Sequence, residues 1–180
     1  KQNVHTELKL LKHSSRTSFY TPLEKIDETD IIVQNLINLI ESTNLLIYKK
    51  RLNSGVGITH CFGRHRIRKR KGLHESPNNA KYPDLYAAIL EYAKKYVSVP
   101  WTSIQVNKNY LAKPHYDARN SKLSYIVGLG SYTGGELYIN NKPIDIHNKP
   151  ILFNGALWEH YVGMFVGGRY SLVFFNQLAH

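Results

Sequence analysis

The sequence predicts an α+β domain in which two helices precede a strand-rich half. Before residue 100, two stretches carry apolar residues at helical spacing, and after it short runs of Ile, Val, Tyr and Phe are broken by Gly and Asn. The chain has 180 residues, of which 42% are hydrophobic, and this is enough for one domain with one sizeable core. We therefore expect a sheet sandwich or barrel with both helices packed against it.

The helices and strands divide the single expected domain, residues 1–180, into three parts. Residues 1–28 are polar and weakly patterned and should form an irregular lead-in. Residues 29–99 should form a helical and basic support region, and residues 100–177 the strand-rich core. The sequence shows no internal repeat and no low-complexity tract.

The first predicted helix is ETDIIVQNLINLIEST, residues 28–43, with Thr29 or Asp30 as its N-cap. The second is YPDLYAAILEYAKKYV, residues 82–97, where Pro83 suits the first turn and the apolar residues form a stripe. Both helices are amphipathic, so each should lie against another element. The predicted strands are TSIQVNKNY, SYIVGLG, GELYI, PILFN and RYSLVFF.

Cysteine content and hydropathy indicate the compartment. Cys61 is the one cysteine and cannot form an internal disulfide, and no segment has the ~18 uncharged apolar residues that a membrane span needs. We therefore expect an intracellular protein without a membrane segment, nuclear if the source is a eukaryote. The sequence does not fix the oligomeric state, and we favour a monomer. The sequence starts at Lys1 without a charged-then-apolar leader, so we expect it to be a domain of a longer protein.

Positive charge is concentrated in one stretch of the chain. There are 24 Lys and Arg against 13 Asp and Glu, a balance that favours polyanions as partners. The segment GRHRIRKRKG, residues 63–72, holds six of these cations. Arginine at every second position from Arg64 to Arg70 predicts four guanidinium groups on one face of a strand or hairpin arm, spaced for a phosphate backbone. The alternative is a solvated loop without a partner.

A candidate metal site lies in KPHYDARN, residues 113–120. His115 and Asp117 share one face of an extended segment, so both side chains can reach one ion. Alone, this pattern also fits a surface pair without a role. His160, 43 residues after Asp117, completes two histidines and one carboxylate, the ligand set of non-haem Fe(II) oxygenases. A structural zinc site is the alternative, but it would need a fourth ligand and more cysteines.

Arg169 and Ser171 follow in the next strand-like stretch, on one face. In such oxygenases a keto acid chelates the metal, and its far carboxylate needs a fixed cation. Arginine supplies a planar fork that lysine cannot reproduce, and Ser171 adds a hydroxyl. Asn107 is a candidate for the near carboxylate, although asparagine beside a strand end is also a common turn residue.

Together these residues resemble the Fe(II)- and 2-oxoglutarate-dependent dioxygenases. The resemblance covers residues 100–177 and implies a double-stranded β-helix, a jelly-roll or cupin-like core, with the N-terminal helices on its major sheet. It implies that the two histidines and the aspartate hold Fe(II), that the arginine and the serine bind the distal carboxylate of 2-oxoglutarate, and that O2 is a co-substrate. The residues that carry it are His115, Asp117, His160, Arg169 and Ser171.

Two further features are similar to the TET/JBP group, which oxidises the 5-methyl group of pyrimidines in nucleic acid. PHYDARN extends the metal pair to H-x-D-x-x-N, and SYIVGLGSYTGGELYI follows with glycines at tight turns. The resemblance implies that Asn120 holds a flipped base, which Gln177 contacts at a position where the group commonly has histidine. The segment CFGRHRIRKRKGLHESPNN resembles the basic segment upstream of the core in the same group. Because an extruded base leaves a backbone to be held, we expect Arg64, Arg66 and Arg68 to contact the nucleic acid. The expected reaction is hydroxylation of 5-methylcytosine or thymine in nucleic acid, with DNA favoured over RNA.

Three other functions remain open at this point. An AlkB-like nucleic-acid demethylase and a prolyl or lysyl hydroxylase would use the same metal ligands. An AlkB-like enzyme would show a further run of arginines after the distal histidine, whereas only Arg169 follows His160, and a peptide hydroxylase has no need of the basic stretch. An inactive cupin-like nucleic-acid binding module would leave the metal and co-substrate residues without a role.

Overall fold

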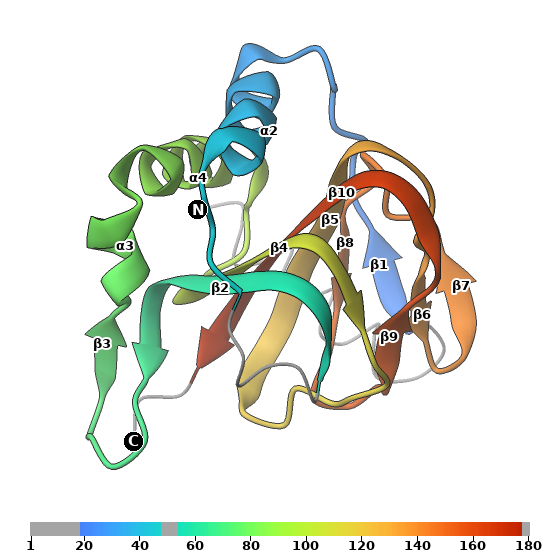
Figure 1. Ribbon diagram of the computed structural model, residues 1–180. Helices are drawn as coiled ribbons and strands as arrows, with labels where there is room; N and C mark the ends of the chain where they lie inside the picture. The colour runs from blue at the N-terminus through green and yellow to red at the C-terminus, as the bar shows by residue number, and fades with distance from the viewer. Residues whose placement is uncertain (1–18, 48–53, 178–180) are drawn as a thin grey trace.

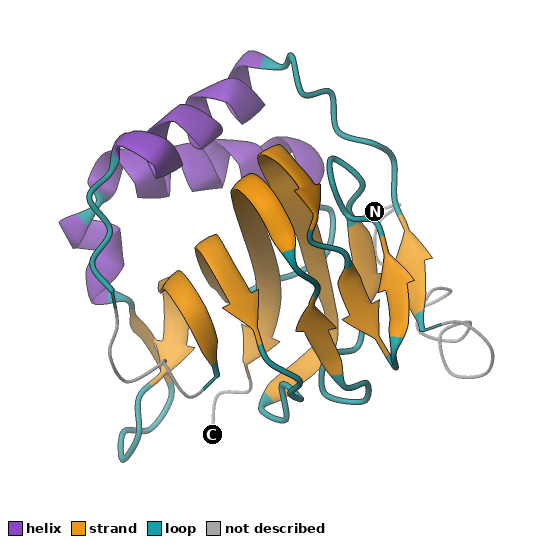
Figure 2. Cartoon of the chain, turned by 45° about the vertical axis from the view of Figure 1, so that its right-hand side comes forward, coloured by secondary structure: helices purple, strands orange, loops and turns teal. Residues whose placement is uncertain are grey.

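Two antiparallel sheets form the body of the protein, and helices cover the outer face of the larger one (Figures 1 and 2). The computed structural model describes residues 19–47 and 54–177, so the expected lead-in before residue 19 lies outside the described residues. The large sheet has seven strands in the order β1-β8-β5-β10-β4-β2-β3, and the small sheet has three in the order β7-β6-β9. This arrangement confirms the expected α+β class, a jelly-roll core with helices packed on the major sheet.

The strands of both sheets pair with antiparallel neighbours throughout. The large sheet contains β1 (Tyr20–Pro22), β2 (Gly55–Arg66), β3 (Leu73–Glu75), β4 (Ser103–Ala112), β5 (Asn120–Gly134), β8 (Ile151–Phe153) and β10 (Phe165–Gln177). The small sheet contains β6 (Leu137–Ile139), β7 (Lys142–Ile144) and β9 (His160–Val162).

The two long helices form where the sequence predicts them. α2 (Ile31–Ser42) has Asp30 as its N-cap, and the Asp30 side chain accepts a hydrogen bond from the N–H of Ile32 at 3.0 Å. α4 (Pro83–Tyr96) begins at the proline. A five-residue helix, α3 (Pro77–Lys81), precedes it and is too short to show a periodic pattern. Within the described residues, none of the helices combines the length and the hydropathy that crossing a bilayer requires.

Alternation along the strands gives the large sheet two different faces. Toward the helices it presents buried apolar side chains such as Val127, Leu172 and Phe174, which pack with those of α2 and α4. The other face, toward the small sheet, carries a second apolar cluster that includes Ile126 and Phe153. This inner face also carries polar side chains, which line a cavity between the sheets.

The large sheet begins well before residue 100, which differs from the expected division of the chain. β2 pairs with β4 along most of its length and so belongs to the core sheet. Three glycines and several polar residues in GVGITHCFGRHR hide the alternation of this strand. β2 ends at Arg66, so the expectation of four arginines on one strand face is wrong: Arg68 and Arg70 lie in the turn of the β2–β3 hairpin.

Asp30 links the start of α2 to the end of α4. Its carboxylate accepts hydrogen bonds from the Lys95 ammonium, the Tyr96 hydroxyl and the Ile32 N–H. These contacts, with Lys95 foremost, lower the pKa of Asp30 from 3.8 to about 2. The contribution of this carboxylate to stability is therefore complete above pH 3.8 and is lost as the pH falls toward about 2.

We expect Asp30→Asn to keep the N-cap, because Asn caps a helix as well as Asp, but to lose the charged contact with Lys95. At neutral pH the variant should unfold at a lower urea concentration than the wild type. The two urea midpoints should converge as the pH falls from 3.8 to about 2. A difference that persists unchanged at the acid end would show that the charge of Asp30 does not stabilise the contact between the helices.

Candidate active site

The site is built where the chain leaves β4 and where β9 begins. The N–H of His115 donates to the His160 carbonyl at 3.1 Å, and the N–H of His160 donates to the His115 carbonyl at 3.0 Å. The N–H of Asp117 donates to the Gly155 carbonyl at 2.8 Å. These backbone bonds bring together side chains that are 43 residues apart in the chain. The three side chains predicted to share an ion therefore lie side by side.

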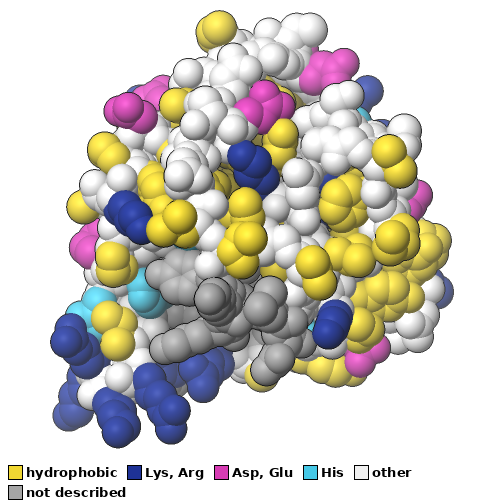
Figure 3. All heavy atoms as spheres, viewed as in Figure 1, with side chains coloured by type: hydrophobic (Ala, Val, Ile, Leu, Met, Phe, Trp, Pro, Cys, Tyr) yellow, Lys and Arg dark blue, Asp and Glu magenta, His cyan; other side chains and the backbone are white. Residues whose placement is uncertain are grey.

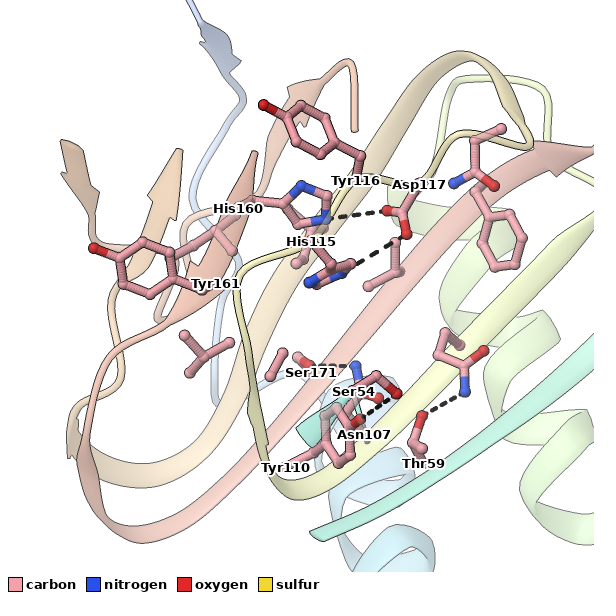
Figure 4. Close-up of a pocket in the computed structure, with 18 of the residues that line it drawn as sticks. Ser54, Thr59, Asn107, Tyr110, His115, Tyr116, Asp117, His160, Tyr161 and Ser171 are labelled. Carbon is pink, nitrogen blue, oxygen red and sulfur yellow. Dashed lines mark hydrogen bonds and ion pairs between the residues drawn. The ribbon is translucent and has the colours of Figure 1, made fainter. Parts of the chain in front are cut away.

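The three side chains point their ligand atoms at one place (Figure 4). Nε2 of His115 lies 3.7 Å from Oδ1 of Asp117, and Nε2 of His160 lies 3.1 Å from Oδ2 of the same carboxylate. One ligand atom from each residue lies within 4.8 Å of the other two. Among residues 19–47 and 54–177 this is the one group of three metal-binding side chains gathered so closely.

The second ring nitrogen of each histidine contacts a backbone carbonyl. Nδ1 of His115 lies 2.6 Å from the Lys113 carbonyl, and Nδ1 of His160 lies 2.9 Å from the Trp158 carbonyl. A carbonyl only accepts, so each Nδ1 carries the hydrogen, and in the neutral ring each Nε2 presents a lone pair. Two lone pairs and a carboxylate then face one another, an arrangement that a divalent cation stabilises and that fits Fe(II).

Gly155 leaves room for the aspartate. A Cβ atom at this position would lie 2.8 Å from Oδ2 of Asp117 and 3.3 Å from the ring of His160. A Cβ is fixed to the backbone and cannot move away, so a larger residue would displace the carboxylate from the ring.

Arg169 is a buried cation on β10, with 1% of its surface exposed. Its Nε donates to the Gly135 carbonyl at 3.1 Å, and the rings of Tyr132 and Phe165 lie 5.5 and 5.9 Å from the guanidinium carbon. Its Nη2 is buried without a hydrogen-bond partner, and no carboxylate in the described part of the chain forms an ion pair with it. Burial lowers the pKa of Arg169, because the charged form loses hydration. An anion that reaches this guanidinium would therefore be bound strongly.

A cavity of about 440 Å³ lies between the two histidines with Asp117 on one side and Arg169 on the other. The metal-binding side chains and Arg169 line it, and so does Ser171, two residues further along β10 on the same face. Asn107 lies opposite Ser171 on β4, and its Nδ2 donates to the serine Oγ at 2.9 Å (Figure 4). Three side chains that can bind a metal, together with a buried cation in the same cavity, can hold the two ends of a short keto diacid.

The two residues expected to contact a base also line this cavity. Asn120 on β5 and Gln177 on β10 are cross-strand partners. Oε1 of Gln177 accepts a hydrogen bond from the N–H of Arg66 at 2.8 Å. This oxygen is therefore already engaged, which leaves the amide N–H groups of Gln177 as the better candidates for contact with a base.

The arginines of the basic stretch lie outside the cavity. Arg66 and Arg68 line a second hollow beside the β2–β3 hairpin, and Arg64 lies opposite Glu75 on β3. The basic stretch therefore lies beside this cavity and does not line it.

The polar side chains of the cavity wall that the sequence does not assign to the site include three on β2 and β4: Thr59, Gln105 and Tyr110. Alternation on the strand TSIQVNKNY could have found Gln105, because it shares a face with Asn107. Thr59 lies on β2, a strand that the composition hides. Tyr110 is one of 13 tyrosines and carries no separate signal.

Comparisons with known proteins give matches among solved structures only. No protein-family model matches the chain, and no curated protein sequence matches it. An oxidoreductase of the 2OG-Fe(II) oxygenase family from Burkholderia pseudomallei has a TM-score of 0.53 at 15% identity, over 96% of this chain and 88% of that one. A prolyl-4-hydroxylase from Pseudomonas putida has a TM-score of 0.57 at 11% identity, over 96% and 100%.

Two further solved structures that match are a TET protein and an ALKBH protein. NgTET1, solved in complex with 5mC DNA, has a TM-score of 0.52 at 17% identity, and the match spans 66% of this chain but only 60% of that one. OsALKBH1 has a TM-score of 0.56 at 14% identity, over 88% and 98%. At such identities the likeness is one of fold. The chain shares its fold with these structures, one of which is a 2OG-Fe(II) oxygenase, and this is the fold that the resemblance implies.

Proposed function

We propose that the protein is an Fe(II)- and 2-oxoglutarate-dependent dioxygenase that hydroxylates the 5-methyl group of a pyrimidine, 5-methylcytosine or thymine, in nucleic acid, with DNA favoured. The observation that carries the enzyme class is one cavity that joins three metal-binding side chains to the buried, unpaired Arg169. The fold supports the same class, because it matches a structure of the 2OG-Fe(II) oxygenase family.

The metal-binding residues His115, Asp117 and His160 would hold Fe(II). Iron with 2-oxoglutarate and O2 supplies, when bound, the oxidation of an unactivated C–H bond. The protein keeps both imidazole rings oriented through their Nδ1–H bonds to backbone carbonyls, so that the Nε2 lone pairs stay directed at the ion.

The co-substrate residues lie on neighbouring strands. Arg169 would bind the distal carboxylate of 2-oxoglutarate with its unpaired Nη2. Because Ser171 Oγ already accepts from Asn107, its own O–H is free to donate to that carboxylate. We therefore assign Asn107 the role of orienting the serine hydroxyl, in place of the expected contact with the near carboxylate. Ile126 and Phe153 line the cavity with apolar surface, which helps to exclude water.

The nucleic-acid branch is supported by Asn120 and by positive charge. Asn120 lines the cavity three residues after the metal-binding Asp117, where its amide can pair with an extruded base. The exposed hairpin cations favour a polyanion. NgTET1, whose fold this chain shares, was solved with 5mC DNA. The prolyl hydroxylase and OsALKBH1 folds match as well, so the alternatives of a peptide hydroxylase and an AlkB-like demethylase need a direct test.

Product analysis makes that test. The protein is incubated with Fe(II), 2-oxoglutarate and ascorbate on DNA that contains 5-methylcytosine or thymine, and nucleosides are measured by mass spectrometry. A hydroxymethyl product supports the proposal and identifies the base. Loss of an N-alkyl group from a damaged base, or hydroxylation of a proline or lysine peptide, without any product on 5-methylpyrimidines would assign the protein to one of the alternatives.

Loss of one ligand should remove the metal without unfolding the protein. Mn(II), which resists oxidation, should stabilise the wild type by about 2.7 kcal/mol at a hundredfold excess over Kd, seen as a higher melting temperature. Asp117→Asn should lose most of this shift, because an amide brings no negative charge. His74→Ala, a histidine on β3 outside the cavity, is the matched control and should keep it. A full shift in Asp117→Asn would place the metal elsewhere.

Replacement of the Arg169 guanidinium should weaken the binding of 2-oxoglutarate and leave metal binding unchanged. Arg169→Lys should raise the 2-oxoglutarate concentration for half-maximal succinate formation roughly ten- to hundredfold, because one ammonium cannot replace a bidentate fork. Mn(II) binding without 2-oxoglutarate should be unchanged and controls for the fold. An unaltered requirement for 2-oxoglutarate would mean that Arg169 has another role.

The amide of Asn120 should affect the choice of base. Asn120→Ala should reduce the ratio of kcat/KM values for the preferred and the disfavoured 5-methylpyrimidine by the equivalent of about 1–3 kcal/mol, the usual worth of a base-edge contact. The salt dependence of DNA binding should be unchanged, since no charge is removed. Asn38→Ala, on the exposed side of α2, is the control. The same ratio in both variants would exclude Asn120 from the base site.

A further inference from the structure

The β2–β3 hairpin and the turn after Asp117 enclose a second, strongly basic hollow of about 400 Å³. Five cations between Arg66 and Lys71, together with Arg119, line it. In Figure 3 the Lys and Arg side chains gather at the lower end of the molecule, where Figure 1 places this hairpin. The hollow is therefore a local concentration of charge and not an average property of the surface.

The charge in this hollow has no counter-charge from the protein. No acidic side chain lines it, and within the described residues none of its six cations forms an ion pair. The turn residues 68–71 are exposed. Like charges held this close repel one another, so a polyanion that enters the hollow stabilises the arrangement.

Arg119 belongs to both hollows, because it also lines the cavity that holds the metal-binding residues. It lies in a turn closed by a hydrogen bond from the N–H of Asn120 to the Asp117 carbonyl at 2.9 Å. Its Cα is two residues from that of Asp117 and thus at most about 7 Å away. The Arg119 cation therefore has the charged hairpin on one side. On its other side are the residues that would contact the reacting base.

A hydrogen bond to the Gln177 side chain and one strand pairing hold the hairpin beside the cavity. The N–H of Arg66 donates to Oε1 of Gln177 at 2.8 Å, and Gln177 pairs in turn with Asn120 on β5. Gln177 in the cavity wall therefore lies next to the start of the hairpin at Arg66. On its other side Gln177 lies next to Asn120, which follows Arg119 in the turn. A ligand that reaches from the cavity past Arg119 meets the hairpin cations next.

We propose that Arg119 binds the phosphate adjacent to the nucleotide whose base enters the cavity, and that the strand continues over the cations between Arg66 and Lys71. The inference rests on the proposed function, since that function puts a base in the cavity. A guanidinium fork matches two phosphate oxygens, and a nucleic-acid strand repeats the phosphate at each step, so successive cations can each meet one. The substrate is therefore a strand, and a free nucleoside lacks the group that Arg119 reads.

The inference is tested by neutralising one phosphate of the oligonucleotide at a time and measuring how tightly each oligonucleotide binds. Wild type, Arg119→Ala and Lys94→Ala, each loaded with Mn(II) and 2-oxoglutarate, are titrated with fluorescent single-stranded oligonucleotides that contain one 5-methylcytosine. Each oligonucleotide carries one uncharged methylphosphonate at a different position. Lys94 is the control, an exposed cation on α4, which packs on the face of the large sheet away from the cavity.

In the wild type and in Lys94→Ala, one neutral linkage next to the target should weaken binding on the order of tenfold, the effect of losing one charge-assisted contact. In Arg119→Ala the neutral linkage next to the target should cause no further loss of affinity. Neutral linkages further from the target should weaken binding as much as they do in the wild type. Equal losses in the wild type and Arg119→Ala at every linkage would overturn the inference. Displacement of the oligonucleotide by polyglutamate of equal charge would also overturn it and indicate an acidic protein partner.

The proposed reaction is scored separately, by mass spectrometry of the unmodified oligonucleotide after incubation with Fe(II). Coupling between Arg119 and one linkage without any hydroxymethyl product supports the inference and contradicts only the reaction. A hydroxymethyl product without such coupling contradicts only the inference.

Discussion

The reciprocal backbone hydrogen bonds between His115 and His160 are the contact on which the site depends. They form a bridge between the segment that leaves β4 in the large sheet and β9 in the small sheet. A metal site needs its ligands held to within about half an ångström, and side chains on unsupported loops do not meet this requirement. The bridge meets it for both histidines at once, and the bond from Asp117 to the Gly155 carbonyl holds the third ligand to the same framework.

The charges in the cavity are arranged for a ligand and not for the stability of the empty protein. An unsatisfied buried donor costs about 1–3 kcal/mol, and Arg169 carries one in its Nη2. Nε2 of each histidine and the carboxylate of Asp117 face one another, so three possible ligand atoms meet at one place. A divalent cation bound by these atoms and a keto diacid bound by the guanidinium would give both groups a partner. The basic hollow extends this logic outward, with cations that have no partner in the described residues.

Local periodicity predicts much of this architecture, and non-local contacts account for what it misses. Helical spacing defines α2 and α4, and strand alternation alone puts Arg169 and Ser171 on one face. The sequence does not predict β2, because its glycines and polar residues hide the alternation of a strand. The burial of β2 depends on its pairing with β4, which is distant in the sequence. The engagement of Gln177 by the Arg66 backbone joins residues 111 apart, and no local pattern reveals such a contact. Arg119 has the appearance of an ordinary surface residue until the hairpin folds beside it.

The central claim is that one cavity holds a metal at the two histidines and Asp117 and a keto diacid between that metal and Arg169. A crystal structure of the protein with Mn(II) and 2-oxoglutarate, with anomalous data collected for manganese, tests it most directly. The account predicts one anomalous peak bound by His115, Asp117 and His160, and 2-oxoglutarate with its distal carboxylate on Arg169 and Ser171. A peak at other side chains, or 2-oxoglutarate bound away from Arg169, would contradict it.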